Sequence, residues 1–217
     1  MLPLYVNKNR PLEKVFTKKR TAMEENSDEG STLKVILVGY SGVGKTSLIN
    51  SYFDQPEALN TSPTVAPAFC SSKITLKNGK NVVLHIWDTA GQERFQSIGQ
   101  MFYRDSDIAF VCFDKTTENT IGEWIKRVLD QVSTCKIFLV LTKSDLLSNE
   151  EMSQMKAKSN ILKEQHHATE FFITSSTTLN GVKELYYAAA TLASEKEQMP
   201  GEILVLQSAQ AKPKKCC

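Results

Sequence analysis

The stretch GYSGVGKTSLIN, from Gly39 to Asn50, decides the fold of this chain. Its Gly39, Gly44, Lys45 and Thr46 fit G-x-x-x-x-G-K-[ST], the loop whose backbone N–H groups wrap a phosphate chain. Because the lysine and threonine open a helix right after a strand, we expect Lys45 to neutralise β- and γ-phosphates and the Thr46 hydroxyl to ligate Mg²⁺. The residues expected to hold the nucleotide here are Ser41, Gly42, Val43, Gly44, Lys45, Thr46 and Ser47.

The composition is that of an ordinary soluble domain with tails. Of the 217 residues, 41% are hydrophobic and 23% are charged, enough to bury a core in one domain. The net charge of +2 neither favours nor excludes nucleic acid, and we expect no nucleic-acid partner. The five cysteines form no C-x-x-C pair and no secretory signal is evident, which favours reduced, cytosolic thiols. No apolar run is long enough to span a bilayer, so we expect a chain that does not cross a membrane, although it could still attach to one.

Three parts follow one another along the chain. Residues 1–32 are expected to be a disordered extension, basic at first and acidic later, with Met23 as a possible true start. A basic, acid-poor start can also be a transit peptide or a membrane-touching arm. Residues 33–193 are expected to form the nucleotide-binding domain, and residues 194–217 a flexible tail.

Strand and helix patterns alternate from Leu33 onward. Apolar, β-branched runs predict strands at 33–38, 107–113, 136–141 and 170–175, and helical spacing follows Lys45 and covers 118–132, 149–165 and 181–197. Two strand-like runs within 69–88 flank Asn78-Gly79, a strong hairpin signal. The predicted fold is therefore α/β: a P-loop NTPase domain with a mostly parallel six-stranded sheet, one antiparallel hairpin strand and helices on both faces. Ligands of such sheets bind at the carboxyl ends of the strands.

The motif WDTAGQERF, Trp87 to Phe95, ends the second strand of the hairpin. Asp88 is placed to hold Mg²⁺, Gly91 can turn its N–H towards a γ-phosphate, and Gln92 can orient an attacking water. Asp-Thr-Ala-Gly is also ordinary turn chemistry. Its position 43 residues after Lys45 in a P-loop chain favours the nucleotide role.

The motif TKSD, Thr142 to Asp145, follows an apolar strand and indicates which base is bound. The Asp145 carboxylate can accept hydrogen bonds from N1–H and from the exocyclic amine of guanine, a pair that adenine lacks. The aliphatic stem of Lys143 can cover the base. A strand-end loop with ordinary charges is the alternative, but here TKSD favours GTP and disfavours a P-loop kinase or ATPase.

With these motifs in order, Leu33 to Ala193 resembles the Ras superfamily of small GTPases and, within it, the Rab family. WDTAGQERF followed by FYR (102–104) is Rab-like, as are Cys216 and Cys217 at the terminus. TVAPAF (64–69) and TKSDLL (142–147) are similar to the endosomal and autophagy-linked Rabs.

The resemblance implies further site residues. Thr64, nineteen residues after Lys45, matches the switch I threonine that binds Mg²⁺ and the γ-phosphate. A loop matching Ser175, Ser176 and Thr177 contacts the guanine carbonyl in the family. An aromatic triad matching Phe69, Trp87 and Phe102 touches effectors; a purely structural role for these aromatics is the alternative, since aromatics in strands usually pack.

The function implied is a switch of vesicle traffic that hydrolyses GTP to GDP with Mg²⁺, using Lys45, Thr64, Gly91 and Gln92. Turnover should be slow without an activating protein, because no arginine is evidently placed to act in cis. The family also implies an exchange factor, a GTPase-activating protein, a Rab escort protein, a dissociation inhibitor and effectors that bind the switch regions. A weakly hydrolysing, GTP-loaded membrane scaffold is the alternative, against which Gln92 argues.

The end AKPKKCC suggests a membrane anchor. Stable anchoring takes two lipid chains, or one chain plus basic residues, and two thiols after three lysines could supply both. The ending is not C-a-a-X, so two geranylgeranyl groups on Cys216 and Cys217 are implied by the Rab resemblance alone. The protein is expected to localise to the cytoplasmic face of an intracellular membrane, endosomal or autophagy-related, and to cycle between that membrane and the cytosol.

Three positions depart from the family pattern. Thr142 replaces the usual Asn, a mild loss of a base contact, and Thr177 replaces Lys. Glu57 stands where the family carries an aromatic that packs on the base. We therefore expect faster GDP release than in a typical Rab.

Overall fold

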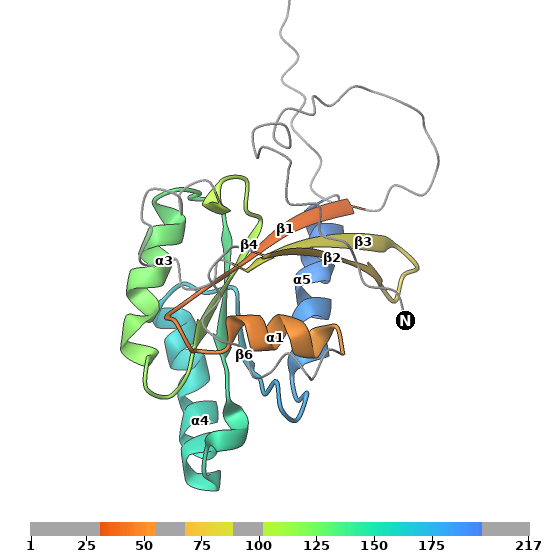
Figure 1. The fold of residues 1–217 in the computed structure, drawn as a ribbon. Coiled ribbons are helices and arrows are strands. Elements are labelled where there is room, and N and C mark those ends of the chain that lie inside the picture. Colours follow the sequence, from red (N-terminus) through yellow and green to blue (C-terminus); the bar gives the residue numbers. More distant parts are fainter. Residues whose placement is uncertain (1–30, 55–67, 89–101, 197–217) are drawn as a thin grey trace, which may run out of the picture.

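The computed structural model describes residues 31–54, 68–88 and 102–196 (Figure 1). The elements in chain order are β1 (Ser31–Val38), α1 (Lys45–Tyr52), β2 (Ala68–Thr75), β3 (Asn81–Asp88), β4 (Ile108–Phe113), the short 3-10 helix η4 (Glu118–Thr120), α3 (Ile121–Leu129), β5 (Lys136–Leu141), the 3-10 helix η5 (Ser144–Leu146), α4 (Asn149–Gln165), β6 (Glu170–Ile173) and α5 (Val182–Lys196). None of the helices within these ranges combines the length and hydropathy that a bilayer span requires.

The six strands form one sheet in the order β2-β3-β1-β4-β5-β6. Only β2 and β3 are antiparallel; the other four pairs are parallel. This confirms the expected α/β architecture. Because β1 lies between β3 and β4 and is parallel to both, the carboxyl ends of these three central strands meet at one edge of the sheet.

The β2–β3 hairpin closes through a longer turn than Asn-Gly most often forms. Gly79 N–H donates to the Leu76 carbonyl at 2.9 Å, and Leu76 N–H donates to the Lys80 carbonyl at 2.8 Å. Gly79 has a φ of 81°, whereas Asn78 does not have positive φ. The two-residue turn typical of Asn-Gly needs positive φ at both positions, so the hairpin instead has a left-handed glycine after its turn.

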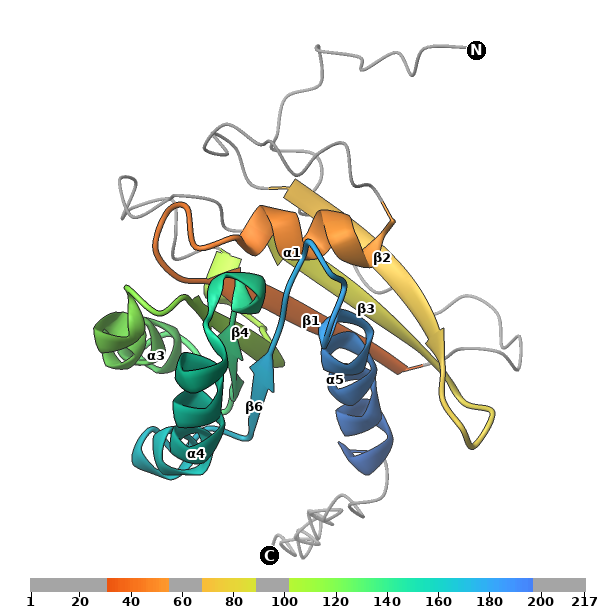
Figure 2. The same ribbon diagram turned by 90° about the horizontal axis from the view of Figure 1, so that it is seen from below.

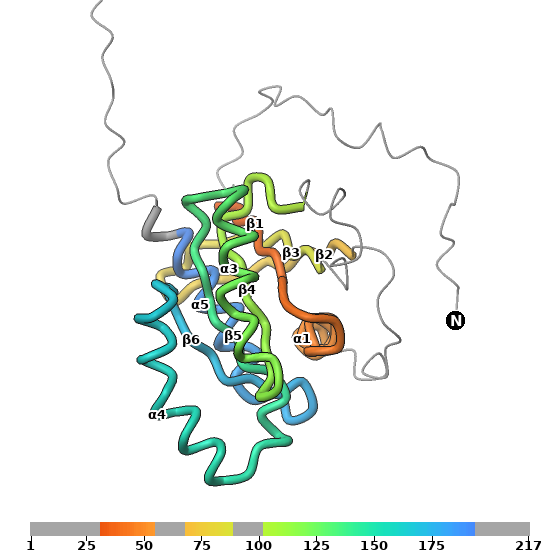
Figure 3. The backbone as a smooth tube through the Cα atoms, turned by 90° about the vertical axis from the view of Figure 1, so that its left-hand side faces the viewer, coloured from red at the N-terminus to blue at the C-terminus, as the bar shows by residue number. Residues whose placement is uncertain are grey.

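Two apolar clusters cover the two faces of the sheet. Figure 2 shows α4 and α5 on opposite sides of β6. One packs α1 and α5 against the sheet through Leu48, Leu185 and the fully buried Tyr186. The other packs α3 against the sheet through Trp124 and Val128, and α4 through Leu162. Figure 3 shows α1 and α4 on opposite sides of the strands. Burial of β4 on both faces explains why all six of its residues are apolar.

Helix α4 begins at a reciprocal cap. The Ser148 side chain accepts from Glu151 N–H at 3.2 Å, and the Glu151 carboxylate accepts from Ser148 N–H at 2.8 Å. This arrangement satisfies two N–H groups that a helix start otherwise leaves without partners. It ends the loop after β5 at a defined residue, which limits the conformations of the TKSD segment just before it.

Candidate functional site

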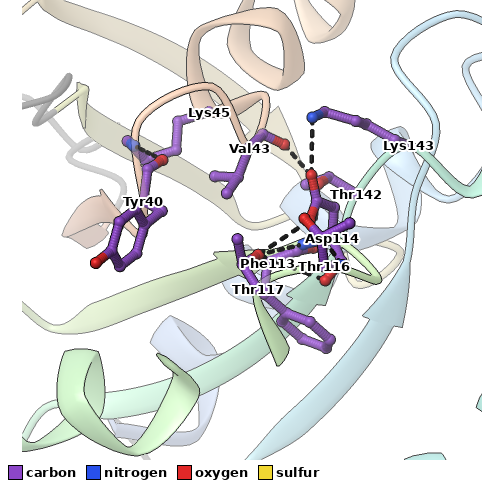
Figure 4. Close-up of polar contacts among 9 residues, drawn as sticks. All are labelled: Tyr40, Val43, Lys45, Phe113, Asp114, Thr116, Thr117, Thr142 and Lys143. Atoms are coloured by element: carbon purple, nitrogen blue, oxygen red, sulfur yellow. Dashed lines mark hydrogen bonds and ion pairs between the residues drawn. The ribbon is translucent and has the colours of Figure 1, made fainter. Parts of the chain in front are cut away.

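The phosphate loop (39–46) joins β1 to α1 at the carboxyl edge of the sheet. Lys45 is buried, and its ammonium donates to the carbonyls of Gly39 at 2.6 Å and Tyr40 at 2.8 Å (Figure 4). A Cβ on Gly39 would lie 2.1 Å from the carbonyl oxygen of Cys112 on β4, and the φ of Gly39 is 140°. The loop therefore passes so close to the neighbouring strand that only glycine fits there.

Helix α1 presents its N-terminus to this loop without a side-chain cap. Gly44 precedes the helix with a φ of 103° and, having no side chain, makes no capping hydrogen bond to it. A helix start of this kind has N–H groups and the positive end of the helix dipole available to an anion. The geometry of the loop and of the start of α1 is therefore compatible with the predicted binding of phosphate.

The hydroxyl of Thr46 donates to the carboxylate of Asp88 at 2.5 Å. The two residues come from α1 and the end of β3, and Asp88 is only 1% exposed. Hydroxyl and carboxylate oxygens are the ligands that Mg²⁺ prefers, so this pair fits the predicted metal site. Thr64, the third predicted ligand, lies outside the described residues. Within those residues no three His, Cys, Asp or Glu side chains form an alternative metal cluster.

The TKSD segment lies at the same edge, after β5. The Asp145 carboxylate is exposed, and its Oδ1 accepts from the hydroxyl of the buried Ser175 at 2.6 Å. Ser175 belongs to the loop after β6, where Ser176 is half-buried and Thr177 is exposed. The structure thus brings Asp145 together with the first residue of the predicted base-contacting loop. The hydroxyl donor holds the carboxylate in one orientation and still leaves it accessible to a ligand.

Two contacts at this edge were not anticipated from the sequence (Figure 4). The Thr142 hydroxyl lies 2.6 Å from the Val43 carbonyl and 3.1 Å from the Phe113 carbonyl. It therefore connects the TKSD segment directly to the phosphate loop. Thr142, expected only to lose a base contact relative to Asn, has a structural contact of its own.

The second unanticipated residue is Asp114, which follows β4. Its carboxylate accepts from the Lys143 ammonium at 2.8 Å and from the Thr116 hydroxyl at 2.7 Å. Burial favours the neutral acid, but the hydrogen bonds from Lys143 and Thr116 outweigh it and lower the pKa of Asp114 to about 2. A carboxylate directly after a buried strand, in the run Asp-Lys-Thr-Thr, is typical of a turn, but nothing in this run indicates a contact with Lys143.

Comparison with known proteins places these features in a family. The Ras family profile matches residues 34–195. The chain belongs to the Ras family. Its relatives include the Ras-related protein Rab-7a of Dictyostelium discoideum, 34% identical over 199 residues that cover 85% of this chain and 96% of that protein. The Ypt/Rab-type GTPase ypt7 of Schizosaccharomyces pombe is 35% identical over 173 residues, or 75% of this chain and 82% of ypt7.

A viral relative is more similar over a shorter stretch. The probable Rab-related GTPase of Acanthamoeba polyphaga mimivirus is 40% identical over 125 residues, which cover 56% of this chain and 58% of the viral protein. The resemblance to Rab proteins is thereby confirmed.

The three aromatics of the expected Rab triad lie together. The ring centroids of Phe69 and Trp87 are 4.9 Å apart, and those of Trp87 and Phe102 are 5.9 Å apart. Phe69 is 53% exposed, which a side chain serving only to fill the core would not be. Lys34 also places its ammonium 5.3 Å from the centre of the Trp87 ring. The triad thus forms a partly exposed aromatic surface, available to a partner.

The remaining predicted site residues lie outside the described ranges. They are Gly91 and Gln92 of the WDTAGQERF motif and the terminal Cys216 and Cys217; Glu57, the departure at the base-packing position, belongs with them. Their roles stay predictions.

Proposed function

We propose that this Rab-type chain is a switch that binds GTP, hydrolyses it slowly to GDP, and regulates membrane traffic in its GTP form. The observation that carries the proposal is that three features lie at one edge of the sheet: the phosphate loop, the Thr46–Asp88 pair and the Asp145–Ser175 pair. Together they provide a phosphate cradle, oxygen ligands for a metal and a carboxylate suited to guanine.

Each group has a defined task in binding. Lys45 and the first turn of α1 bind the β- and γ-phosphates. Asp145 accepts two hydrogen bonds from guanine, while Ser175, Ser176 and Thr177 line the other edge of the base. Thr46, Asp88 and Thr64 would hold Mg²⁺, which when bound neutralises charge on the phosphates. Gln92 orients the attacking water, and Gly91 and Thr64 contact the γ-phosphate in the GTP state.

Nucleotide choice is tested by competition against labelled GDP. GTP should displace it and ATP should not. In Asp145→Asn the paired acceptor is lost, so GTP affinity should fall strongly with little gain for ATP. Unchanged GTP affinity in that variant would refute Asp145 as the base-recognising residue.

Hydrolysis is tested in a single turnover of bound GTP. The wild-type chain should hydrolyse slowly, and Gln92→Leu should slow it further while binding stays intact. A wild-type rate indistinguishable from that of Gln92→Leu would favour the weakly hydrolysing scaffold instead.

We also propose that Cys216 and Cys217 carry geranylgeranyl groups that anchor the chain to the cytoplasmic face of an endosomal or autophagy-related membrane. The lysines before them, the Rab family and the Rab7-type relatives support this address. An exchange factor, an activating protein, an escort protein, a dissociation inhibitor and effectors that bind Phe69, Trp87 and Phe102 complete the cycle. Removal of the two cysteines should make the tagged protein cytosolic, whereas removal of residues 1–22 should not. If the N-terminal truncation alone released it, the basic arm would be the anchor.

A further inference from the structure

The two carboxylate oxygens of Asp114 have separate partners. Oδ1 accepts from the backbone N–H of Thr116 at 3.0 Å, from its hydroxyl at 2.7 Å and from the Thr117 hydroxyl at 3.1 Å. Oδ2 accepts from the Lys143 ammonium at 2.8 Å (Figure 4). One oxygen thus organises the turn after β4, and the other reaches a lysine 29 residues further along the chain.

Lys143 is held at both ends. Its backbone has a φ of 55°, in the left-handed region that residues with a side chain rarely adopt. Backbone bonds on either side keep it there: Thr142 N–H donates to the Phe113 carbonyl at 2.8 Å, and Ser144 N–H donates to the Thr174 carbonyl at 3.1 Å. At the other end, Asp114 holds the ammonium. The direction of the aliphatic stem between these two points is therefore largely determined.

The ion pair is better shielded than an ordinary surface pair. The Asp114 side chain is 13% exposed and the Lys143 side chain 38%, whereas the neighbouring Lys115–Glu151 pair is 47% and 42% exposed. The low pKa of Asp114 keeps its carboxylate ionised at neutral pH. A lysine side chain that is ordered before its ligand arrives does not lose that conformational freedom on binding.

We propose that Asp114 is a positioning residue for guanine nucleotides: it holds the Lys143 ammonium so that the lysine stem lies ready along the base site, and it thereby slows nucleotide release. The proposal rests on the base-recognition role proposed for Thr142 to Asp145. It assigns a function in nucleotide retention to a residue at the end of β4.

The test uses the full chain loaded with fluorescent GDP, and measures release into excess unlabelled GDP with Mg²⁺ present. Asp114→Asn keeps an amide oxygen for the turn but replaces Oδ2 with an NH₂ group, which cannot accept from Lys143. Release should become about three- to tenfold faster, an effect between that of an exposed ion pair and that of a buried charged hydrogen bond. Lys115→Met removes the more exposed adjacent ion pair and should leave the rate unchanged.

A double-mutant cycle with Lys143→Met shows whether Asp114 acts through the lysine. Methionine retains an apolar stem without the ammonium, so this variant should release GDP about as fast as Asp114→Asn, and adding Asp114→Asn to it should change nothing further. If the double variant released GDP faster than either single variant, by the product of the two factors, Asp114 would act through the turn after β4 and the proposal would be overturned. An unchanged release rate in Asp114→Asn would also overturn it.

If Asp114→Asn does not fold, the proposal can be tested by comparing GDP release from Lys143→Met and Lys143→Arg. Arginine can still pair with Asp114 and should stay near the wild-type rate, whereas a wild-type rate in Lys143→Met would overturn the proposal.

Inosine diphosphate separates this proposal from the proposed function. It lacks the exocyclic amine that Asp145 recognises but offers Lys143 the same purine face. Asp114→Asn should accelerate release of both nucleotides by the same factor, and a changed preference between them would contradict a role through the stem. If Asp145→Asn leaves GTP affinity intact, the base assignment itself fails. If Asp145→Asn weakens GTP and Asp114→Asn has no effect, only the role of Asp114 fails.

Discussion

The two ends of the nucleotide site are built in different ways. The phosphate end comes from one continuous stretch, residues 39–47, in which Lys45 donates to backbone carbonyls and Gly39 packs against a neighbouring strand. The base end comes from three separate loops joined by side-chain contacts, Asp114–Lys143 and Asp145–Ser175. The phosphate end should therefore be most sensitive to backbone space and to metal, and the base end to the loss of single polar atoms.

The largest effect is expected where the phosphate loop touches β4. In Gly39→Ala the new Cβ would meet the Cys112 carbonyl at 2.1 Å, so the loop or strand must move. We expect a loss of about 3 kcal/mol or more in the free energy of unfolding, measured by thermal unfolding of the GDP-loaded protein. The matched variant Gly79→Ala, in the β2–β3 turn away from the nucleotide site, adds its Cβ where nothing lies within 4 Å, at a φ of 81°. Only backbone strain, about 1–2 kcal/mol, should follow there. Equal losses would show that space does not limit the loop.

The second prediction concerns the metal side of the phosphate end. Thr46→Val removes the hydroxyl that meets Asp88 at 2.5 Å, and GDP release in Mg²⁺ should become roughly tenfold faster or more. Chelation of Mg²⁺ with EDTA should abolish most of the difference between variant and wild type, because the role proposed for the lost hydroxyl is to ligate the metal. Thr46→Ser, which keeps the hydroxyl, should stay close to wild type. A difference that persists in EDTA would assign Thr46 a purely structural role.

A smaller and metal-independent effect is expected where the two ends join. Thr142→Val removes the hydroxyl that lies 2.6 Å from the Val43 carbonyl, and GDP release should become about fivefold faster, the scale of one neutral hydrogen bond. The factor should be the same with and without EDTA, in contrast to Thr46→Val. Thr142→Ser serves as the control that retains the donor. If EDTA removed the effect of Thr142→Val on GDP release, the contribution of Thr142 would depend on the metal, and the two ends of the site would not act independently.

The smallest effect is expected in the core, at a residue whose replacement should change the stability of the fold but not the rate of GDP release. The Tyr186 ring is fully buried and stacks on Tyr52 with centroids 4.0 Å apart. Among the described residues its hydroxyl has no hydrogen-bond partner. Tyr186→Phe should therefore stabilise the GDP-loaded protein by about 1 kcal/mol, a rise of roughly 2–4 °C in Tm, with no change in GDP release. Destabilisation would mean that the hydroxyl is satisfied in solution.

Most of the fold was predictable because local patterns agree with the tertiary structure. The predicted helix over 149–165 matches α4 from Asn149 to Gln165, where Ser148 and Glu151 also supply the cap. The run at 136–141 matches β5, since a strand buried on both faces reads as a continuous apolar segment. The predicted strand at 170–175 ends earlier, at Ile173, because Thr174 and Ser175 already turn to meet the TKSD loop.

The sequence by itself determined the phosphate loop, the carboxylates Asp88 and Asp145 and the family, because each motif is a short run whose chemistry depends on neighbouring residues. Which loops touch was decided only by the tertiary structure. Asp114 meets Lys143, and Thr142 meets the phosphate loop, because β4 lies between β1 and β5 in the sheet. Strand order brings together polar groups of residues that are 29 and 99 positions apart, and no local pattern predicts such a pairing.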